Sequence, residues 1–198
     1  MADAVLSALR KEAASCMRCG LYKPATQTVF GEGPAHAAFV LVGEAPGDRE
    51  DIVGKPFVGP AGAVLDRALA DAGIDRAKVY VTNAVKHFKF EPRGKRRLHA
   101  RPNAGEIQAC RWWLEREFEA IKPKFAVALG ATAAQALTGH AVTIGRSRGR
   151  EIQLLGVRGL ITVHPSYILR IEDEAAKEAE YKRFVAELRL ARTLEGRH

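Results

Sequence analysis

Four short runs of apolar, mostly β-branched residues alternate along the chain with longer stretches of helical periodicity. The apolar runs cover residues 37–43, 78–83, 124–130 and 160–164. The helical stretches cover residues 60–73, 103–121, 130–139 and 174–193. Strands that are apolar on both faces are typical of a parallel sheet covered by helices. The pattern therefore predicts a three-layer α/β/α fold with a central, mainly parallel, four-stranded sheet.

The length and composition of the chain predict one domain over residues 1–198. A chain of 198 residues, 47% of them hydrophobic, is long and apolar enough to bury its own core. Residues 149–155 are compatible with a further strand or a hairpin.

Residues 1–20 resemble a short amphipathic helix rather than a secretory signal, and no apolar run approaches the roughly 20 residues that span a bilayer. We therefore expect a monomeric cytoplasmic protein without a membrane partner.

The charge balance of the chain favours a polyanionic partner. Lys and Arg number 31 and Asp and Glu number 23, which gives a formal net charge of +8. Nucleic acid is the first candidate for such a chain, because a basic surface attracts the phosphate backbone. The alternative is a solvated basic surface that binds no polyanion.

Residues 42–62, which follow the first apolar run, combine two Gly/Pro turns with carboxylates and an aromatic ring. Ligands of open α/β folds bind beyond the carboxyl ends of the parallel strands. Glu44 follows the expected strand directly, and the ring of Phe57 is available to stack on a flat ligand. The alternative is a plain strand-to-helix turn with Phe57 in the core. A phosphate-binding loop is excluded, because the Gly-Lys-Ser/Thr ending is missing.

The segment "HPSYILR", residues 164–170, follows the fourth apolar run. His164 is expected at a strand tip, where a ligand can reach it. Ser166 is either the cap of a following helix or a nucleic-acid contact. Leu169 suits insertion into a duplex, and Arg170 suits a phosphate contact. A serine hydrolase is a poor fit, because the chain has no nucleophile elbow.

Three cysteines and one histidine are candidates for a metal centre. Cys16 and Cys19 form a CxxC pair, and Cys110 lies far downstream in a helical stretch. His87, just past the second apolar run, can supply a fourth ligand. Such a set is compatible with zinc or with an iron–sulfur cluster in which histidine replaces one cysteine. The alternatives are a buried structural role for Cys110 and redox chemistry at the CxxC pair.

The segment from residue 86 to residue 102 is strongly basic, and its second part, "GKRRLHARP", shows neither a helical nor a strand period. Lysines and arginines interleaved with aromatic rings suit a surface that follows a nucleic-acid backbone. His99 stands among these cations. Nearby cations disfavour protonation of its imidazole, whereas a bound DNA phosphate would favour it, so the two effects oppose each other. The alternative is a surface histidine without a role.

Taken in order, these motifs resemble those of a known family. The strings "GEAPG", "GKPFVGPAG", "VTN", "CMRC" with Cys110, and "HPSYILR" are similar to those of family-4 uracil-DNA glycosylases, which carry a 4Fe-4S cluster. The strings "GKRRLH" and "VKHFKF" resemble the UdgX-type branch, whose members excise uracil from DNA and become covalently joined to it. The resemblance runs from about residue 16 to residue 190.

The resemblance implies roles for the matching residues. Phe57 stacks on the flipped uracil, Asn83 reads its Watson–Crick edge, and His164 hydrogen-bonds a uracil carbonyl and stabilises the departing anion. Glu44 stabilises the positive charge on the sugar, and His99 captures its anomeric carbon. The expected ligands of the 4Fe-4S cluster are Cys16, Cys19, His87 and Cys110.

Two further groups of residues complete the expected site. Those expected to shape the uracil pocket are Gly43, Ala45, Gly47, Asp48 and Glu50, with Glu50 a candidate for excluding the methyl group of thymine. Those expected to contact single- or double-stranded uracil-containing DNA are Lys95, Arg96, Arg97, Ser166, Leu169 and Arg170. Arg97 is expected to hold its loop over the site through a phosphate.

One departure from the UdgX-type pattern keeps two alternatives open. Members of this branch usually have glutamine in the middle of the first motif, where this chain has Ala45, as ordinary family-4 enzymes do. The first alternative is a conventional glycosylase that releases abasic DNA. The second is a DNA-binding module that recognises uracil or damaged strands without chemistry.

Overall fold

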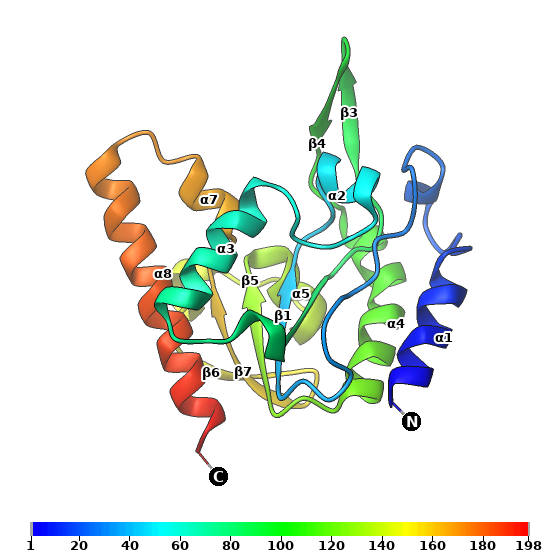
Figure 1. Ribbon diagram of the computed structural model, residues 1–198. Helices are drawn as coiled ribbons and strands as arrows, with labels where there is room; N and C mark the ends of the chain where they lie inside the picture. Colours follow the sequence, from blue (N-terminus) through cyan, green and yellow to red (C-terminus); the bar gives the residue numbers. More distant parts are fainter. Residues whose placement is uncertain (1, 198) are drawn as a thin grey trace.

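The computed structural model describes residues 2–197, and a central five-stranded sheet organises them (Figure 1). The strands in sequence order are β1 (Phe39–Gly43), β2 (Val79–Asn83), β5 (Phe125–Leu129), β6 (Glu151–Leu154) and β7 (Val157–Thr162). Their order across the sheet is β2-β1-β5-β7-β6, with the first four parallel and β6 antiparallel to β7.

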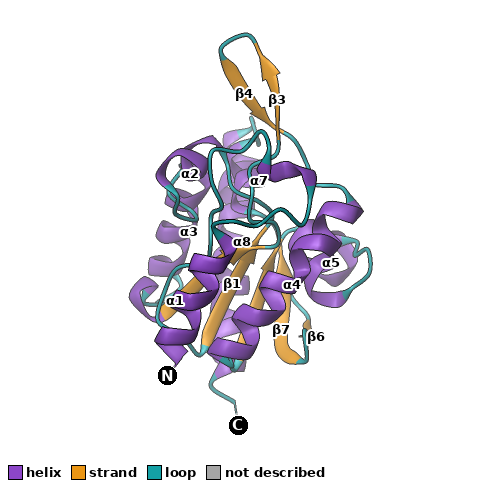
Figure 2. Cartoon of the chain, turned by 90° about the vertical axis from the view of Figure 1, so that its right-hand side faces the viewer, coloured by secondary structure: helices purple, strands orange, loops and turns teal. Residues whose placement is uncertain are grey.

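Helices cover both faces of this sheet (Figure 2). One face carries α1 (Ala2–Ala13), α4 (Ala104–Ile121) and α5 (Ala131–Thr138), and the other carries α3 (Pro60–Asp71) and α8 (Glu174–Glu195). Side chains of β1 alternate between the two resulting cores, with Val40 and Val42 in the first and Leu41 in the second. The predicted three-layer α/β/α fold with a mainly parallel sheet is confirmed.

The sheet has one strand more than predicted. β6 lies at the edge, and its burial alternates along the strand, so it carries no continuous apolar run. It joins β7 through a tight turn at Leu155 and Gly156, whose φ angles are +50° and +75°. Residues 149–155, which were compatible with a strand or a hairpin, thus contribute one arm of a hairpin.

The basic segment forms a second, separate hairpin that rises beyond the carboxyl edge of the main sheet (Figure 1). It consists of β3 (Phe90–Arg93) and β4 (Arg96–His99), paired antiparallel with Phe90 opposite His99. Gly94 in its turn has a φ of +60°. Most of its residues are exposed on both faces, and no apolar alternation marks them as strands. The segment therefore forms regular strands although its sequence shows no strand period.

The remaining elements are short and lie mostly at the ends of strands. The α-helices are α2 (Asp48–Val53), α6 (Ile144–Ser147) and α7 (Pro165–Leu169), and the 3-10 helices are Gly20–Tyr22 and Arg76–Lys78. Within residues 2–197, no helix is both long enough and apolar enough to cross a bilayer.

Parallel register brings the predicted site residues to one edge of the sheet. Gly43 at the end of β1 pairs with Asn83 at the end of β2. β1 also pairs with β5 on its other side, so the loops after β1 and β5 leave the sheet in the same direction. The strand order changes direction at β1, which is the place where open α/β sheets bind ligands.

Candidate active site

A cavity of about 620 Å³ opens at this edge, between the ends of the strands, α2, α7 and the hairpin. Most of the predicted site residues line it: Glu44, Ala45, Gly47, Asp48, Glu50, Phe57, Asn83, His99, His164, Ser166, Leu169 and Arg170. The lining also includes Arg49, Gly59, Pro60 and Ala61, which were not singled out from the sequence. Segments more than 100 residues apart in the chain thus meet around one space (residues 44 and 164, for example).

Phe57 reaches the cavity because two glycines leave room for its unusual backbone. Its φ of +56° is uncommon for an aromatic residue. A Cβ atom at Gly62 would overlap the Phe57 carbonyl, and a Cβ atom at Gly43 would overlap both the Phe57 ring and the Asn83 amide oxygen. The two turns therefore place an aromatic face and an amide side by side, which is the arrangement that recognition of a flat heterocycle requires.

Glu50 supports the cavity wall from behind. Its carboxylate accepts hydrogen bonds from Gly47 N (3.1 Å) and Gly59 N (2.7 Å), and the residue is only 8% exposed. These bonds tie the two glycine turns together. Glu50 thus holds the wall of the cavity together, and its part in excluding thymine stays a prediction.

Glu44 lies between His99 and a threonine. His99 Nε2 is 3.6 Å from Glu44 Oε1, and the other carboxylate oxygen accepts a hydrogen bond from the Thr132 hydroxyl. Arg101 Nε lies 3.3 Å from the same hydroxyl and 3.8 Å from Glu44 Oε2. Thr132 was not predicted as a site residue, because its position in the string "GATAAQ" carries no chemical signal. The contacts orient one carboxylate oxygen toward the histidine of the hairpin.

His164 is held as a neutral imidazole. Burial is the main cause that lowers its pKa to about 4, and the nearby side chains of His99 and Arg170 act in the same direction. Its Nδ1 accepts a hydrogen bond from Ser166 N (3.2 Å) and lies 2.8 Å from the Ser166 hydroxyl. The ring proton therefore lies on Nε2, where it can be donated to a ligand. The rings of Phe57 and His164 are 6.1 Å apart, centroid to centroid, and inclined by 26°.

We predict that His164→Gln makes the free energy of unfolding less dependent on pH. Between pH 6.5 and about 4 the unfolded chain protonates His164 and the folded chain does not, so this residue costs stability as the pH falls through that window. The cost approaches about 3 kcal/mol at the acidic end. Thermal unfolding of the wild type and of His164→Gln across this range measures the difference. The control is His140→Gln, at an exposed histidine. If the free energy of unfolding of His164→Gln changed with pH as steeply as that of the wild type, the assignment would be contradicted.

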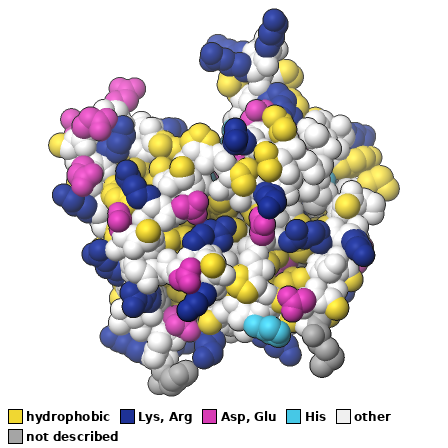
Figure 3. Space-filling model, viewed as in Figure 1, with side chains coloured by type: hydrophobic (Ala, Val, Ile, Leu, Met, Phe, Trp, Pro, Cys, Tyr) yellow, Lys and Arg dark blue, Asp and Glu magenta, His cyan; other side chains and the backbone are white. Residues whose placement is uncertain are grey.

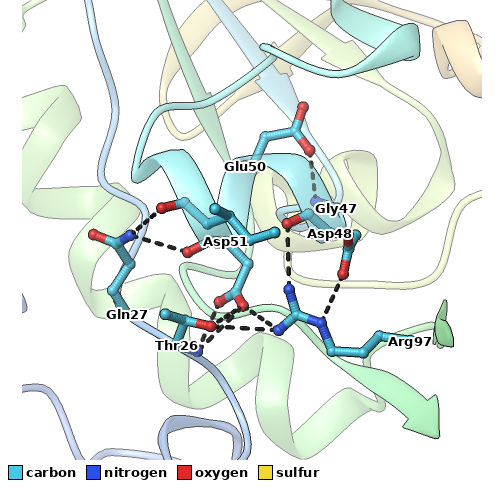
Figure 4. A network of polar contacts seen from close by, with 8 residues as sticks. Thr26, Gln27, Gly47, Asp48, Glu50, Asp51 and Arg97 are labelled. Atoms are coloured by element: carbon cyan, nitrogen blue, oxygen red, sulfur yellow. Dashed lines mark hydrogen bonds and ion pairs between the residues drawn. The ribbon is translucent and has the colours of Figure 1, made fainter. Parts of the chain in front are cut away.

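Arg97 lies elsewhere than predicted. Its guanidinium contacts Asp48 Oδ1 (2.7 Å) and Asp51 Oδ2 (2.6 Å) (Figure 4). The guanidinium also lies 5.2 Å from the ring centroids of Phe88 and Phe90. Buried Asp51 also accepts hydrogen bonds from the backbone and hydroxyl of Thr26. Arg97 therefore fastens the hairpin to α2 by contacts within the protein, where the sequence had suggested a phosphate contact.

The tip of the hairpin is basic and exposed. Lys95 and Arg96 are both exposed there. Basic side chains cover the part of the molecule that protrudes at the top of Figure 3. At the rim of the cavity Leu169 is 45% exposed, and Arg170 is exposed beside it. Their roles in DNA contact remain predictions, and the exposed side chains are placed where a strand entering the cavity would meet them.

The predicted metal ligands come from three parts of the fold. Cys16 follows α1 and accepts a hydrogen bond from Trp113 Nε1 (3.1 Å), and Cys110 on α4 accepts one from Lys86 N (3.1 Å). Burial raises the pKa of Cys110 to about 12, and the neighbouring thiols of Cys16 and Cys19 contribute in the same direction. A bound cation would offset this penalty on the thiolate.

His87 fits the same centre. Its Nε2 lies 2.9 Å from the Thr28 hydroxyl, while its buried Nδ1 has no hydrogen-bond partner in the described residues. Burial lowers the pKa of this imidazole, which favours the neutral form that binds metals. Within residues 2–197, no group of three or more Cys, His, Asp or Glu side chains is arranged to hold a metal ion. The four predicted ligands are thus compatible in chemistry with a metal centre, and their spacing does not form a site for one ion.

An enzyme that acts on a base of DNA must accommodate the flipped nucleotide outside the stack. The cavity described above supplies a stacking face, an amide, a neutral histidine and a carboxylate, and basic groups surround its entrance. Its place at the carboxyl edge of a parallel sheet is the usual one for α/β enzymes. Fold and site together define a base-excising enzyme of the α/β class.

Comparison with known proteins identifies the family within this class. Residues 30–189 match the model of the uracil DNA glycosylase superfamily, and the chain belongs to this family. It is 42% identical over 157 residues to a type-4 uracil-DNA glycosylase of Thermotoga maritima, with 78% of each chain covered. It is 37% identical over 182 residues to that of Archaeoglobus fulgidus, covering 87% of this chain and 88% of the relative. The predicted enzyme class, a uracil-DNA glycosylase, is confirmed.

Proposed function

We propose that this protein excises uracil from DNA and then joins the abasic sugar through His99. The observation that carries the proposal is the position of His99, whose Nε2 lies 3.6 Å from Glu44 Oε1 at the wall of the cavity. A histidine that served only the basic surface would have no reason to face the carboxylate of the site. Both residues line the same space as Phe57, Asn83 and His164.

Recognition begins when the uracil nucleotide leaves the stack and enters the cavity. Phe57 stacks on the ring, and the amide of Asn83 pairs with the Watson–Crick edge of the base. Leu169 and Arg170, at the rim, occupy the gap and hold a phosphate. The exposed cations of the hairpin tip extend the contact along the DNA backbone.

Cleavage of the N-glycosidic bond leaves its electron pair on uracil and positive charge on the sugar. The Nε2–H group of His164 donates a hydrogen bond to the uracil carbonyl and stabilises the departing anion. The carboxylate of Glu44 stabilises the sugar cation electrostatically. Because the pKa of His164 is low, its imidazole is neutral at physiological pH. It therefore stabilises the anion by donating a hydrogen bond and not by carrying a positive charge.

Capture follows when a ring nitrogen of His99 donates its lone pair to the anomeric carbon. The imidazolium that forms loses its N–H proton, and the uracil anion takes up one proton. The N-glycosidic bond to uracil is thereby exchanged for a bond to His99, with neutral uracil as the other product. The carboxylate of Glu44 orients the imidazole and stabilises its charge during this step.

A denaturing gel tests the proposal. The wild-type protein is incubated with an end-labelled, single-uracil oligonucleotide and boiled in detergent. A slow band that survives boiling, in an amount limited by the protein, is expected. Abasic DNA in molar excess over the protein, without such a band, would contradict the adduct.

A conventional turnover glycosylase is the second candidate function, and Ala45 favours it. This small side chain lies at the cavity wall beside Glu44, where it leaves space for a water molecule. Water and His99 would then compete for the same sugar cation. The ratio of free abasic product to boiled adduct in the same gel decides between the two outcomes.

We also propose that Cys16, Cys19, His87 and Cys110 hold a 4Fe-4S cluster. A 4Fe-4S cluster is held by four side chains, each on a separate iron, and histidine can replace one of the cysteines. Bound between α1, the loop after β2 and α4, it would cross-link these segments structurally. The buried Nδ1 of His87 and the buried thiol of Cys110 are the features that support this assignment.

We expect the purified protein to be brown, with broad visible absorbance, and Cys110→Ser to lose most of that absorbance. Serine cannot replace the soft thiolate ligand. Met17, exposed between Cys16 and Cys19, provides the control, because Met17→Ala leaves all four ligands in place. Iron and sulfide analysis accompanies the spectra. A colourless protein with stoichiometric zinc would overturn the cluster and leave the ligand set standing.

A further inference from the structure

A fully buried ion pair lies beneath the cavity, between the end of β2 and α4. Lys86 Nζ is 2.6 Å from Glu117 Oε2, and both side chains are 0% exposed. A buried pair of this kind seldom stabilises a fold more than apolar side chains of similar size would. Its presence therefore calls for an explanation in terms of what the charges hold in place.

The ammonium of Lys86 also donates two hydrogen bonds to the end of β2, the strand that carries Asn83. It donates to the Thr82 hydroxyl (2.6 Å) and to the Asn83 carbonyl (2.7 Å). The second bond spans three residues and closes the turn in which β2 ends. A bond from Ala84 N to Gly43 O (2.9 Å) fixes the same turn to β1. The peptide of Asn83 is thus held from both sides.

The carboxylate of Glu117 is anchored independently of Asn83. Its Oε1 accepts hydrogen bonds from the Tyr80 hydroxyl (2.8 Å) and from Gly31 N (3.2 Å). Glu117 therefore stays in place on α4 and directs the ammonium of Lys86 toward the turn. Lys86 is not among the described residues that line the cavity, and Asn83 is the lining residue to which its ammonium donates a hydrogen bond.

We propose that Lys86 is a positioning residue that sets the Asn83 amide for uracil and against cytosine. The inference rests on the proposed role of Asn83 in reading the base. Uracil and cytosine present opposite donors and acceptors on the edge that an amide reads, so selection depends on holding the amide in one place and orientation. An ammonium that fixes the Asn83 peptide from below supplies this restraint.

The test is a binding measurement with DNA that the enzyme cannot cleave. Two oligonucleotides carry 2′-fluoro-2′-deoxyuridine or 2′-fluoro-2′-deoxycytidine at one position, and the ratio of their dissociation constants gives the selectivity. In Lys86→Met/Glu117→Met both charges are replaced by apolar side chains of similar length, which keeps the core filled. We expect the selectivity to fall about tenfold, which corresponds to the loss of one well-placed hydrogen bond. Affinity for the same DNA with thymine at that position should not change.

Tyr80→Phe is the matched control. It removes another hydrogen bond of Glu117 and leaves the contacts of Asn83 intact, so its selectivity should equal that of the wild type. Thermal unfolding and the visible spectrum of each variant separate positioning from loss of fold or of the cluster. The bond from Lys86 N to Cys110 is a backbone contact and survives the substitution.

The outcomes are distinct. A folded double variant with wild-type selectivity would overturn the proposal and leave the ion pair a structural feature. If the double variant does not fold, Glu117→Gln replaces it, because the amide weakens the hold on the ammonium and should lower selectivity about two- to threefold; an unchanged ratio there overturns the proposal equally. A wild type without preference for uracil would instead refute the role of Asn83 itself. Failure of the His99 adduct affects none of these measurements, because the DNA is not cleaved.

Discussion

His99→Ser is expected to abolish the boiling-resistant adduct while uracil release continues. Serine removes the ring nitrogen that captures the sugar but leaves Glu44 and His164 in the cavity. The sugar cation then reacts with water, and the variant releases abasic DNA. We expect adduct formation to fall below about one part in a thousand of the wild-type rate, as for other nucleophiles removed from covalent sites.

The exposed His140 supplies the matched control for this experiment. It lies after α5 and is not among the residues that line the cavity, so His140→Ser should form the adduct at the wild-type rate. Both variants are compared with the wild type on the same single-uracil oligonucleotide. If His99→Ser still gave the slow band, another residue would be the nucleophile. If it gave neither band nor uracil release, His99 would be needed for cleavage as well as capture.

Glu44→Gln is expected to slow uracil release about 100- to 1000-fold in single-turnover measurements. The amide keeps the size of the side chain and can still accept the hydrogen bond of Thr132, but it carries no charge to stabilise the sugar cation. Adduct formation should fall by the same factor, because capture follows cleavage. The effect of this substitution thus falls on an earlier step than that of His99→Ser.

Glu91→Gln, on the exposed face of the hairpin, controls for the change of net charge. It should leave both rates within about twofold of the wild type, because an exposed charge outside the cavity is largely screened. A Glu44→Gln variant that released uracil at the wild-type rate but formed no adduct would assign Glu44 only to the orientation of His99. Equal losses in both steps support its electrostatic role in cleavage.

The central strands were predictable because each is buried on both faces. β1 and β5 are continuous apolar runs, and their ends locate Glu44 and the turn before α5. The hairpin β3–β4 escaped prediction, and β6 was indicated only as compatible with a strand or hairpin, because both are largely exposed and no apolar period develops there. Register in the hairpin comes instead from the turn at Gly94.

The chemical groups at strand ends were predictable from their position, and the groups that orient them were not. Asn83 and His164 follow apolar runs directly, where ligands of such sheets bind. Thr132 and Lys86 contact partners far away in the chain, Glu44 and Glu117, and neither spacing nor composition indicates these pairs. The same holds for Arg97. Its basic neighbours in the sequence suggest a phosphate contact, and only the structure shows that it pairs with Asp48 and Asp51.

The attachment of the hairpin to α2 through Arg97 has a consequence for the proposed capture of the sugar cation by His99. A free loop would have to be ordered during each encounter with DNA, and the loss of its conformational entropy would slow capture. In the folded protein the hairpin is already ordered, so His99 lies beside Glu44 before DNA binds. Groups held in this way react as if present at effective concentrations of about 10⁵ M or more when well aligned. In the proposed capture by His99, an imidazole held in this way has an advantage over bulk water in reaching the short-lived cation, and the anchoring of Arg97 then favours retention of the DNA.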